Sequence, residues 1–113
     1  MTVEQEAWSQ ELDCLNVTNA AGDPTGGSVR SVGLRIDWQD GPLGRGTEKQ
    51  EPNGAFTEDV ILAAIQRLRF YNESKYRCRE NSLAITHLEE ALHWCQARHQ
   101  ERESRGVQGM HEV

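Results

Sequence analysis

Apolar and polar residues follow different periods in the two halves of this chain. The run SVGLRIDW, residues 31–38, alternates between apolar and polar positions, which predicts a half-buried β-strand. The side chains expected on its buried face are Val32, Leu34, Ile36 and Trp38. A weaker strand is predicted over residues 12–17, and residues 18–28, rich in Gly, Asn, Asp and Pro, predict a turn. We expect the two strands to pair as an antiparallel hairpin.

The carboxyl-terminal half carries the period of amphipathic helices. A first helix is expected to begin at Thr57, which can cap it, and to end near Ser74. A second helix is expected from about Arg79 to about Arg105. The inward apolar positions are Ile61, Ile65 and Leu68 in the first helix, and Ile85, Leu88, Leu92 and Cys95 in the second. Because the link between the helices is short, they should form an antiparallel helical hairpin.

These elements together predict an α+β fold in a single domain, residues 1–113. Residues 1–53 hold the β-hairpin or small sheet and a glycine-rich loop, residues 54–106 the helical hairpin, and residues 107–113 a tail. Apolar residues make up only 36% of the chain, so a monomer would bury a thin core. We therefore expect self-association, at least as a homodimer.

The segment between the predicted sheet and helices, residues 39–54, contains four glycines and two prolines, which excludes a regular element. Loops of this length in small domains are usually functional or disordered. Within it, Leu43, Gly44 and Arg45 form a short stretch where backbone can approach a ligand closely. A solvated linker is the alternative interpretation.

Charge and composition narrow the function classes. The net charge of −6 argues against a DNA- or RNA-binding protein, although residues 54–113 nearly balance 8 basic against 9 acidic side chains. No segment has the length of apolar sequence that a membrane span needs, and the acidic start does not resemble a signal peptide. We expect a cytoplasmic protein whose three cysteines are free thiols.

Polar residues on the second helix suggest a ligand site. At about 100° per residue, Asn81 falls on the apolar stripe, where a carboxamide needs a partner, either a ligand or a contact at the helix start. Arg98 and Arg102 share one side and suit a phosphate or pyrophosphate, or else form a solvated basic end. Tyr71, in competition with Phe70 and Tyr76, can stack on a base or pack in the hairpin.

The spacing of these residues has a geometric consequence. Asn81 and Arg98 are separated by about 25 Å along a helix, too far for one small nucleotide to touch both. A shared ligand would therefore need the arginines of a second, antiparallel subunit, and Trp94 is a candidate for that interface. Catalysis is not indicated, because no nucleophile has an evident base and His87, His93 and His99 are spread around the helix, which excludes a metal site by local spacing.

Three stretches of the chain resemble a known family. VGLRIDWQDGPLGRG, PNGAFTEDVILAAIQRLRFY and CRENSLAITHLEEALHW, with the arginines and RESRGVQG that follow, are similar to the phage Thoeris anti-defence proteins of the first type. The second-helix pattern is also similar to that of the anti-CBASS sponge proteins. The resemblance covers residues 32–113 and implies a non-enzymatic protein that binds glycocyclic ADP-ribose in the host cytoplasm and holds it without cleavage, so that the downstream effector stays inactive.

The resemblance also assigns residues. It implies that Tyr71 stacks on the adenine, that Asn81 binds the base region, and that Arg98 and Arg102 hold the pyrophosphate, in a pocket between subunits. Some relatives form hexamers and bind cyclic trinucleotides at a further site, for which Arg45 and His99 are the candidates here. The stretch Leu43–Arg45 is also a candidate lid. The remaining alternatives are a sponge for cyclic oligonucleotides, a helical adaptor without a nucleotide, and a phosphodiesterase-like enzyme.

Overall fold

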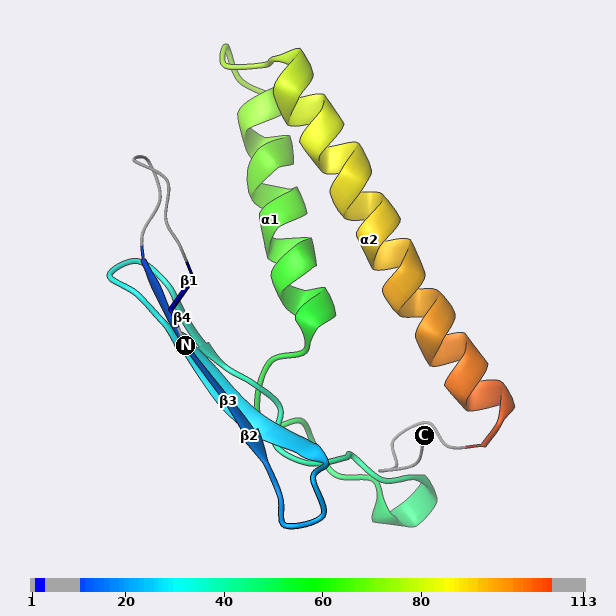
Figure 1. Cartoon of the computed structure of the whole chain (residues 1–113). Helices are drawn as coiled ribbons and strands as arrows, with labels where there is room; N and C mark the ends of the chain where they lie inside the picture. Colours follow the sequence, from blue (N-terminus) through cyan, green and yellow to red (C-terminus); the bar gives the residue numbers. More distant parts are fainter. Residues whose placement is uncertain (1, 4–10, 107–113) are drawn as a thin grey trace. The chain divides into compact units, whose positions relative to one another are not determined.

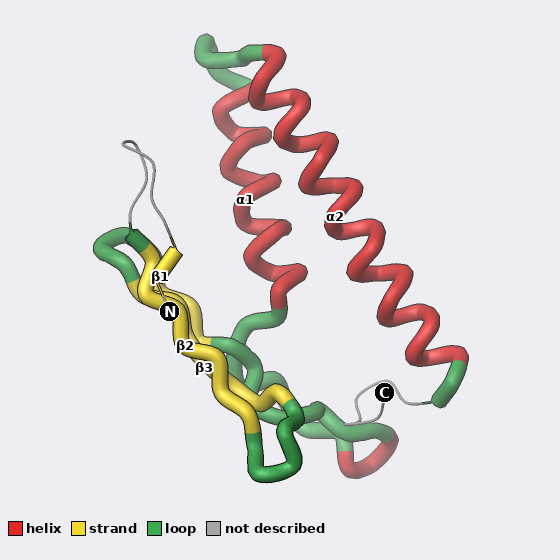
Figure 2. Tube along the Cα trace, viewed as in Figure 1, coloured by secondary structure: helices red, strands yellow, loops and turns green. Residues whose placement is uncertain are grey.

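The computed structural model describes residues 2–3 and 11–106, so the predicted tail, residues 107–113, lies outside the described residues. The chain divides into two compact units. The described residues up to 55 contain a β-sheet, and residues 56–106 contain two helices (Figures 1 and 2). The predicted α+β fold, a small antiparallel sheet followed by a helical hairpin, is confirmed.

The sheet is antiparallel and its strands follow one another in chain order. The strands are β1 (Thr2–Val3), β2 (Leu12–Thr18), β3 (Pro24–Arg30) and β4 (Arg35–Asp37). Cys14, Val29 and Ile36 lie opposite one another on β2, β3 and β4, so they share one face. Val29, on the central strand β3, is 8% exposed, because it has a neighbouring strand on each side.

Two details of the predicted hairpin are wrong. The strand β3 includes residues 24–28 of the segment predicted as a turn, and it lies between the two strands that were expected to pair. The turn is confined to residues 19–23, where the Asn19 carboxamide accepts the backbone N–H groups of Ala21 at 2.9 Å and Asp23 at 3.0 Å. Residues 31–34 form a second turn, so Val32, expected to be buried, is fully exposed.

The glycines of residues 18–28 were misread because a glycine can serve a strand as well as a turn. Gly27 has φ +150°, and a Cβ at this position would lie 2.2 Å from the carbonyl oxygen of Leu15. The strand pairing shifts register beside it, between Asn16 and Thr18. Gly27 therefore allows close approach of two strands at a bulge, which is a recognised use of glycine inside a sheet.

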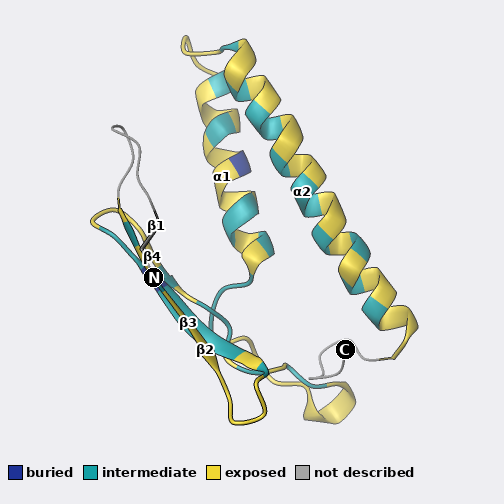
Figure 3. Ribbon diagram, in the orientation of Figure 1, coloured by how far each residue is buried: buried dark blue, intermediate teal, exposed yellow. Residues whose placement is uncertain are grey.

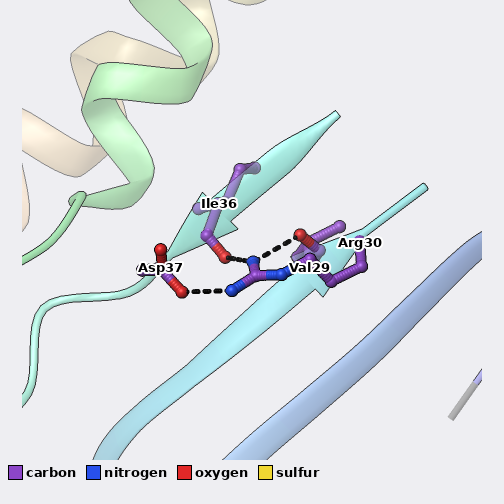
Figure 4. Close-up of polar contacts among 4 residues, drawn as sticks. All are labelled: Val29, Arg30, Ile36 and Asp37. Atoms are coloured by element: carbon purple, nitrogen blue, oxygen red, sulfur yellow. Dashed lines mark hydrogen bonds and ion pairs between the residues drawn. The ribbon is translucent and has the colours of Figure 1, made fainter. Parts of the chain in front are cut away.

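Arg30 ties the central strand to β4. Its Nη1 donates to the carbonyl oxygens of Val29, at 3.0 Å, and Ile36, at 2.6 Å, and its Nη2 pairs with the carboxylate of Asp37 (Figure 4). The hydrogen bond from Arg30 lowers the pKa of Asp37 below its ordinary value. The side chain of Arg30 is therefore engaged within its own sheet.

The helical hairpin consists of α1 (Thr57–Asn72) and α2 (Arg79–Ser104). The helices were predicted to within about two residues, but Thr57 is the first residue of α1 and not its cap. The carboxylate of Asp59 instead accepts the backbone N–H of Phe56 at 2.8 Å. The cap of α2 is Cys78, whose Sγ accepts the backbone N–H of Asn81 at 3.4 Å.

The interface between the two helices is narrow. Ile65 is 1% exposed and is the one fully buried side chain among the described residues of the hairpin (Figure 3). Ile61 and Leu68, its neighbours on the same stripe of α1, are half-buried. The half-buried positions of α2 recur with spacings of three and four and become polar toward the carboxyl end, in the order Ile85, Leu88, Leu92, Cys95, His99, Arg102. The apolar part of the interface thus stops before the end of α2.

Candidate functional site

One end of the hairpin presents aromatic and amide groups. Tyr71, in the last turn of α1, is 40% exposed, and Phe70 beside it is 60% exposed. Their rings meet edge to face with centroids 6.1 Å apart. Asn81 lies near the start of α2, and the link 73–78 joins the two helices directly, so Tyr71 and Asn81 belong to the same end. The structure therefore places two of the predicted site residues at one end of the hairpin.

The corner between the helices is held by Asn72. Its Nδ2 donates to the hydroxyl of Ser82 at 2.9 Å, and its Oδ1 accepts the backbone N–H of Cys78 at 3.2 Å. Its carbonyl oxygen accepts a hydrogen bond from Arg77 at 3.1 Å. These bonds attach the end of α1 to the start of α2, and so set the spacing of Tyr71 and Asn81.

Asn81 itself is half-buried. The sequence left open whether its carboxamide serves the helix start. In the structure the cap acceptor is the sulfur of Cys78, and Asn81 contributes only its backbone N–H. The side-chain carboxamide of Asn81 is therefore not the cap acceptor of α2.

The opposite end of the hairpin carries the two arginines predicted to hold a pyrophosphate. Arg98 is exposed and Arg102 half-buried, both in the last two turns of α2. Near the start of α1, Oε2 of Glu58 lies 3.3 Å from Nε2 of His99. Because Glu58, the second residue of α1, already faces His99, the last turn of α2 with Arg102 extends past the start of α1.

A thiol lies among these charged groups. Partial burial raises the pKa of Cys95, and the charge of the Glu58 carboxylate and its hydrogen bond with the thiol raise it further, while Arg98 opposes the shift. Glu58 thus contacts both Cys95 and His99, a connection that the sequence did not suggest. His99, a candidate for a second ligand site, is engaged with a carboxylate of its own chain.

The two ends are far apart within one chain. The helix α2 runs without interruption from Arg79 to Ser104, so Asn81 and Arg98 are separated by about 25 Å along its axis (Figure 1). The structure therefore keeps Tyr71 and Asn81 apart from Arg98 and Arg102 in a single hairpin. If one small ligand is held by all four, two chains must supply them.

The glycine-rich loop is closed at its base. Oε1 of Gln39 accepts the backbone N–H groups of Asn53 at 2.8 Å and Gly54 at 3.3 Å, while Oδ1 of Asn53 accepts that of Asp40 at 2.8 Å. These reciprocal side-chain bonds join positions 13 to 15 residues apart, a pairing that no local pattern indicates. These hydrogen bonds give the loop a defined structure at its base, unlike a flexible linker.

Inside the loop, the candidate stretch has defined geometry. The carbonyl oxygen of Leu43 accepts the backbone N–H of Gln50 at 2.7 Å, and Gly44 has φ +81°. Arg45 is exposed and precedes the short 3₁₀ helix Gly46–Glu48. Leu43, Gly44 and Arg45 therefore sit on a structured turn of the sheet unit.

The comparison with known proteins bears on both the hairpin and the loop. A family model described as the Acb2/Tad1 hairpin domain matches residues 31–98. The chain belongs to this family. Within the matched segment lie Arg45, Tyr71, Asn81 and Arg98, whereas His99 and Arg102 lie just past its end.

One relative is similar over a longer stretch. Thoeris anti-defense 1 from Bacillus phage SBSphiJ7 is 46% identical over 77 residues, which is 68% of this chain and 51% of the relative. The match thus spans about half the length of that relative, and the activity of this chain as a whole is taken up below as a proposal. Membership in the Acb2/Tad1 hairpin family confirms the resemblance that the three sequence stretches indicated.

The described residues offer neither a membrane span nor a metal site. Neither described helix is both long and apolar enough to cross a bilayer. The described residues also contain no group of three or more His, Cys, Asp or Glu side chains that could hold a metal ion. The candidate site therefore rests on the two polar ends of the helical hairpin.

Proposed function

We propose that this protein is a phage anti-defence sponge that binds glycocyclic ADP-ribose, holds it without cleavage in the cytoplasm of the infected cell, and so keeps the Thoeris effector inactive. The observation that carries the proposal is its membership in the Acb2/Tad1 hairpin family, with 46% identity to Thoeris anti-defense 1. The geometry supports it, because exposed or half-buried groups suited to a base and to phosphates occupy the two ends of the hairpin.

The proposed site lies between two chains arranged head to tail. Tyr71 and Asn81 of one chain face Arg98 and Arg102 of the other, and two-fold symmetry makes a second, identical site. The exposed ring of Tyr71 stacks on adenine, and the carboxamide of Asn81 bonds the base region. The guanidinium groups of Arg98 and Arg102 hold the pyrophosphate through charge-assisted hydrogen bonds.

The thin interface between α1 and α2 agrees with this assembly. Among the described side chains of the hairpin only Ile65 is fully buried, while Leu62, Leu83 and Trp94 are 42%, 40% and 71% exposed. Apolar side chains exposed on both helices offer area that a second copy would cover. A dimer is the smallest assembly that completes the site, and a hexamer is the larger alternative.

No catalytic step is proposed. A sponge needs slow release, which follows from enclosing the ligand and not from reacting with it. We propose that the ordered stretch Leu43–Arg45 acts as a lid, or as part of a second site for cyclic trinucleotides together with His99. The contact of His99 with Glu58 favours the lid, because it engages a group that the second site would need.

The proposal is tested by calorimetric titration of the purified protein with glycocyclic ADP-ribose and, separately, with a cyclic trinucleotide. We expect tight binding of the first, and a loss of about 10- to 100-fold in affinity for Arg98→Ala and for Arg102→Ala, the usual worth of hydrogen bonds to charged groups. Arg105→Ala is the matched control, because Arg105 lies at the same end of α2 and its guanidinium binds Glu101 at 3.1 Å.

Heating the complex then separates a sponge from an enzyme. Intact glycocyclic ADP-ribose recovered by chromatography supports sequestration, whereas a cleaved product identifies a phosphodiesterase-like activity and contradicts the proposal. Flat titrations with both ligands would favour an adaptor without a nucleotide. Binding of the trinucleotide alone would identify a sponge for cyclic oligonucleotides.

A further inference from the structure

The aromatic end of the hairpin contains a cation that the proposed site does not use. The guanidinium carbon of Arg67 lies 5.0 Å from the ring centroid of Tyr71 and 5.3 Å from that of Phe70. The two rings are inclined at 74°, so Arg67 occupies the corner between them. It reaches both rings because residues three and four positions apart are neighbours on a helix.

This arrangement matters for how Tyr71 meets a ligand. An aromatic ring has two faces, and a guanidinium within about 6 Å of the centroid covers one of them. The edge-to-face contact with Phe70 restricts the ring further. Tyr71 nevertheless remains 40% exposed, so part of its surface stays available to a base.

We propose that Arg67 is a positioning residue for Tyr71: it covers one ring face and holds the ring so that a single base stacks on the other. The inference rests on the proposed function, since it concerns how that site presents its aromatic group. It predicts one-sided stacking on one purine, and excludes a site in which Tyr71 is intercalated between two bases.

The chain offers a matched control for the cation. Nζ of Lys75 lies 5.2 Å from the ring centroid of Tyr76, a cation–aromatic pair of similar geometry. Tyr76 is 63% exposed and lies in the link between the helices. Lys75→Ala removes a positive charge near the same end of the hairpin without touching Tyr71. Its titration therefore reports the general effect of charge on an anionic ligand.

The experiment is a double-mutant cycle with glycocyclic ADP-ribose, measured by calorimetry on the full chain. Arg67→Ala should weaken binding about two- to five-fold beyond Lys75→Ala, the range of an exposed cation–aromatic contact. Arg67→Lys should recover part of the loss. In a Tyr71→Ala background, Arg67→Ala should add nothing beyond the control, because Arg67 acts through the ring.

A second measurement uses the free protein. In nuclear magnetic resonance spectra, the side-chain CH₂ protons of Arg67 should be shifted upfield by the ring and return toward ordinary positions in Tyr71→Leu. Absence of that shift overturns the inference without any ligand.

If Arg67→Ala lowers the affinity for glycocyclic ADP-ribose equally with and without Tyr71, Arg67 touches the ligand itself, which contradicts a positioning role. If the wild-type protein binds and Arg67→Ala loses no more affinity than Lys75→Ala, the role of Arg67 is overturned and the proposed function stands. If the wild-type protein does not bind glycocyclic ADP-ribose, both the role of Arg67 and the proposed function are overturned.

Discussion

The separation of the two ends of the hairpin makes the proposed site testable by complementation between chains. Consider one variant that lacks the aromatic end, Tyr71→Ala with Asn81→Ala, and a second that lacks the cationic end, Arg98→Ala with Arg102→Ala. Each homodimer carries a defect in both of its sites and should bind glycocyclic ADP-ribose weakly. A mixed dimer should differ, because its two sites draw on the chains in opposite ways.

The expected fraction of intact sites follows from the length of α2. Asn81 and Arg98 are separated by about 25 Å along α2, so no site can be completed within one chain. In a mixed dimer, one site combines both defective ends and the other combines both intact ends. Random reassortment of equal amounts makes about half of the dimers mixed, and half of their sites intact. The mixture should therefore show about one quarter of the wild-type sites, each with wild-type affinity.

The assay compares the two variants alone with the same variants co-expressed or refolded together. Calorimetry supplies the number of sites and the affinity independently, and chromatography with light scattering gives the oligomeric state. A suitable reference is a mixture of the Arg98→Ala/Arg102→Ala variant with Arg105→Ala, in which every site that takes its cations from the Arg105→Ala chain is intact.

Two results would refute the reasoning. If the mixture of defective variants binds no more ligand than its components although mixed dimers form, the four residues do not share a site between chains. If the purified protein is strictly monomeric and still binds with full affinity, the two ends are not both needed. Either result would remove the basis for the proposed arrangement.

Three further predictions concern stability. Ile65→Ala should lower the free energy of unfolding in urea by about 2–4 kcal/mol, because Ile65 is 1% exposed and its neighbours cannot fill the gap; a loss below about 1 kcal/mol would contradict its place in the core. Gly27→Ala should destabilise the sheet by about 1–3 kcal/mol because its Cβ would meet backbone at 2.2 Å, whereas Gly26→Ala, with nothing closer than 3.4 Å, should be much milder in thermal unfolding. Because Arg30 lowers the folded-state pKa of Asp37, this pair stabilises the sheet at pH values above the ordinary carboxyl pKa, and that stabilisation is lost as the pH falls through the lowered pKa. Asp37→Asn should therefore weaken the dependence of stability on acid pH, measured by circular dichroism. An unchanged dependence would contradict this prediction.

Much of the helical hairpin was predictable because helical order is local. The stripe through Ile65 and Leu88 repeats at the helix period, and the short link leaves only an antiparallel arrangement. The same local geometry fixed the distance between Asn81 and Arg98 along α2, so that a small ligand held by both would need two chains. The cap of α2 was not predicted, because Cys78 is not among the residues that usually cap a helix. At α1, Thr57 was expected to cap the helix and is instead its first residue.

The sheet was predicted less well because strand pairing joins residues that are distant in sequence. The alternation in residues 31–38 indicated a strand, yet β4 covers only Arg35–Asp37 and pairs with β3. The glycines of β3 carry no signal that separates a turn from a bulge. Only the close approach of Gly27 to Leu15 shows which it is.

By itself, then, the sequence determined the class of fold, the hairpin and its two chemically different ends, since these depend on periods of a few residues and on side-chain chemistry. The tertiary structure alone decided that β3 lies between β2 and β4, that Gln39 and Asn53 close the loop, and that Glu58 meets His99. Each of these contacts joins positions separated by many residues. Their formation depends on how the folded chain brings distant segments together, which no local pattern records.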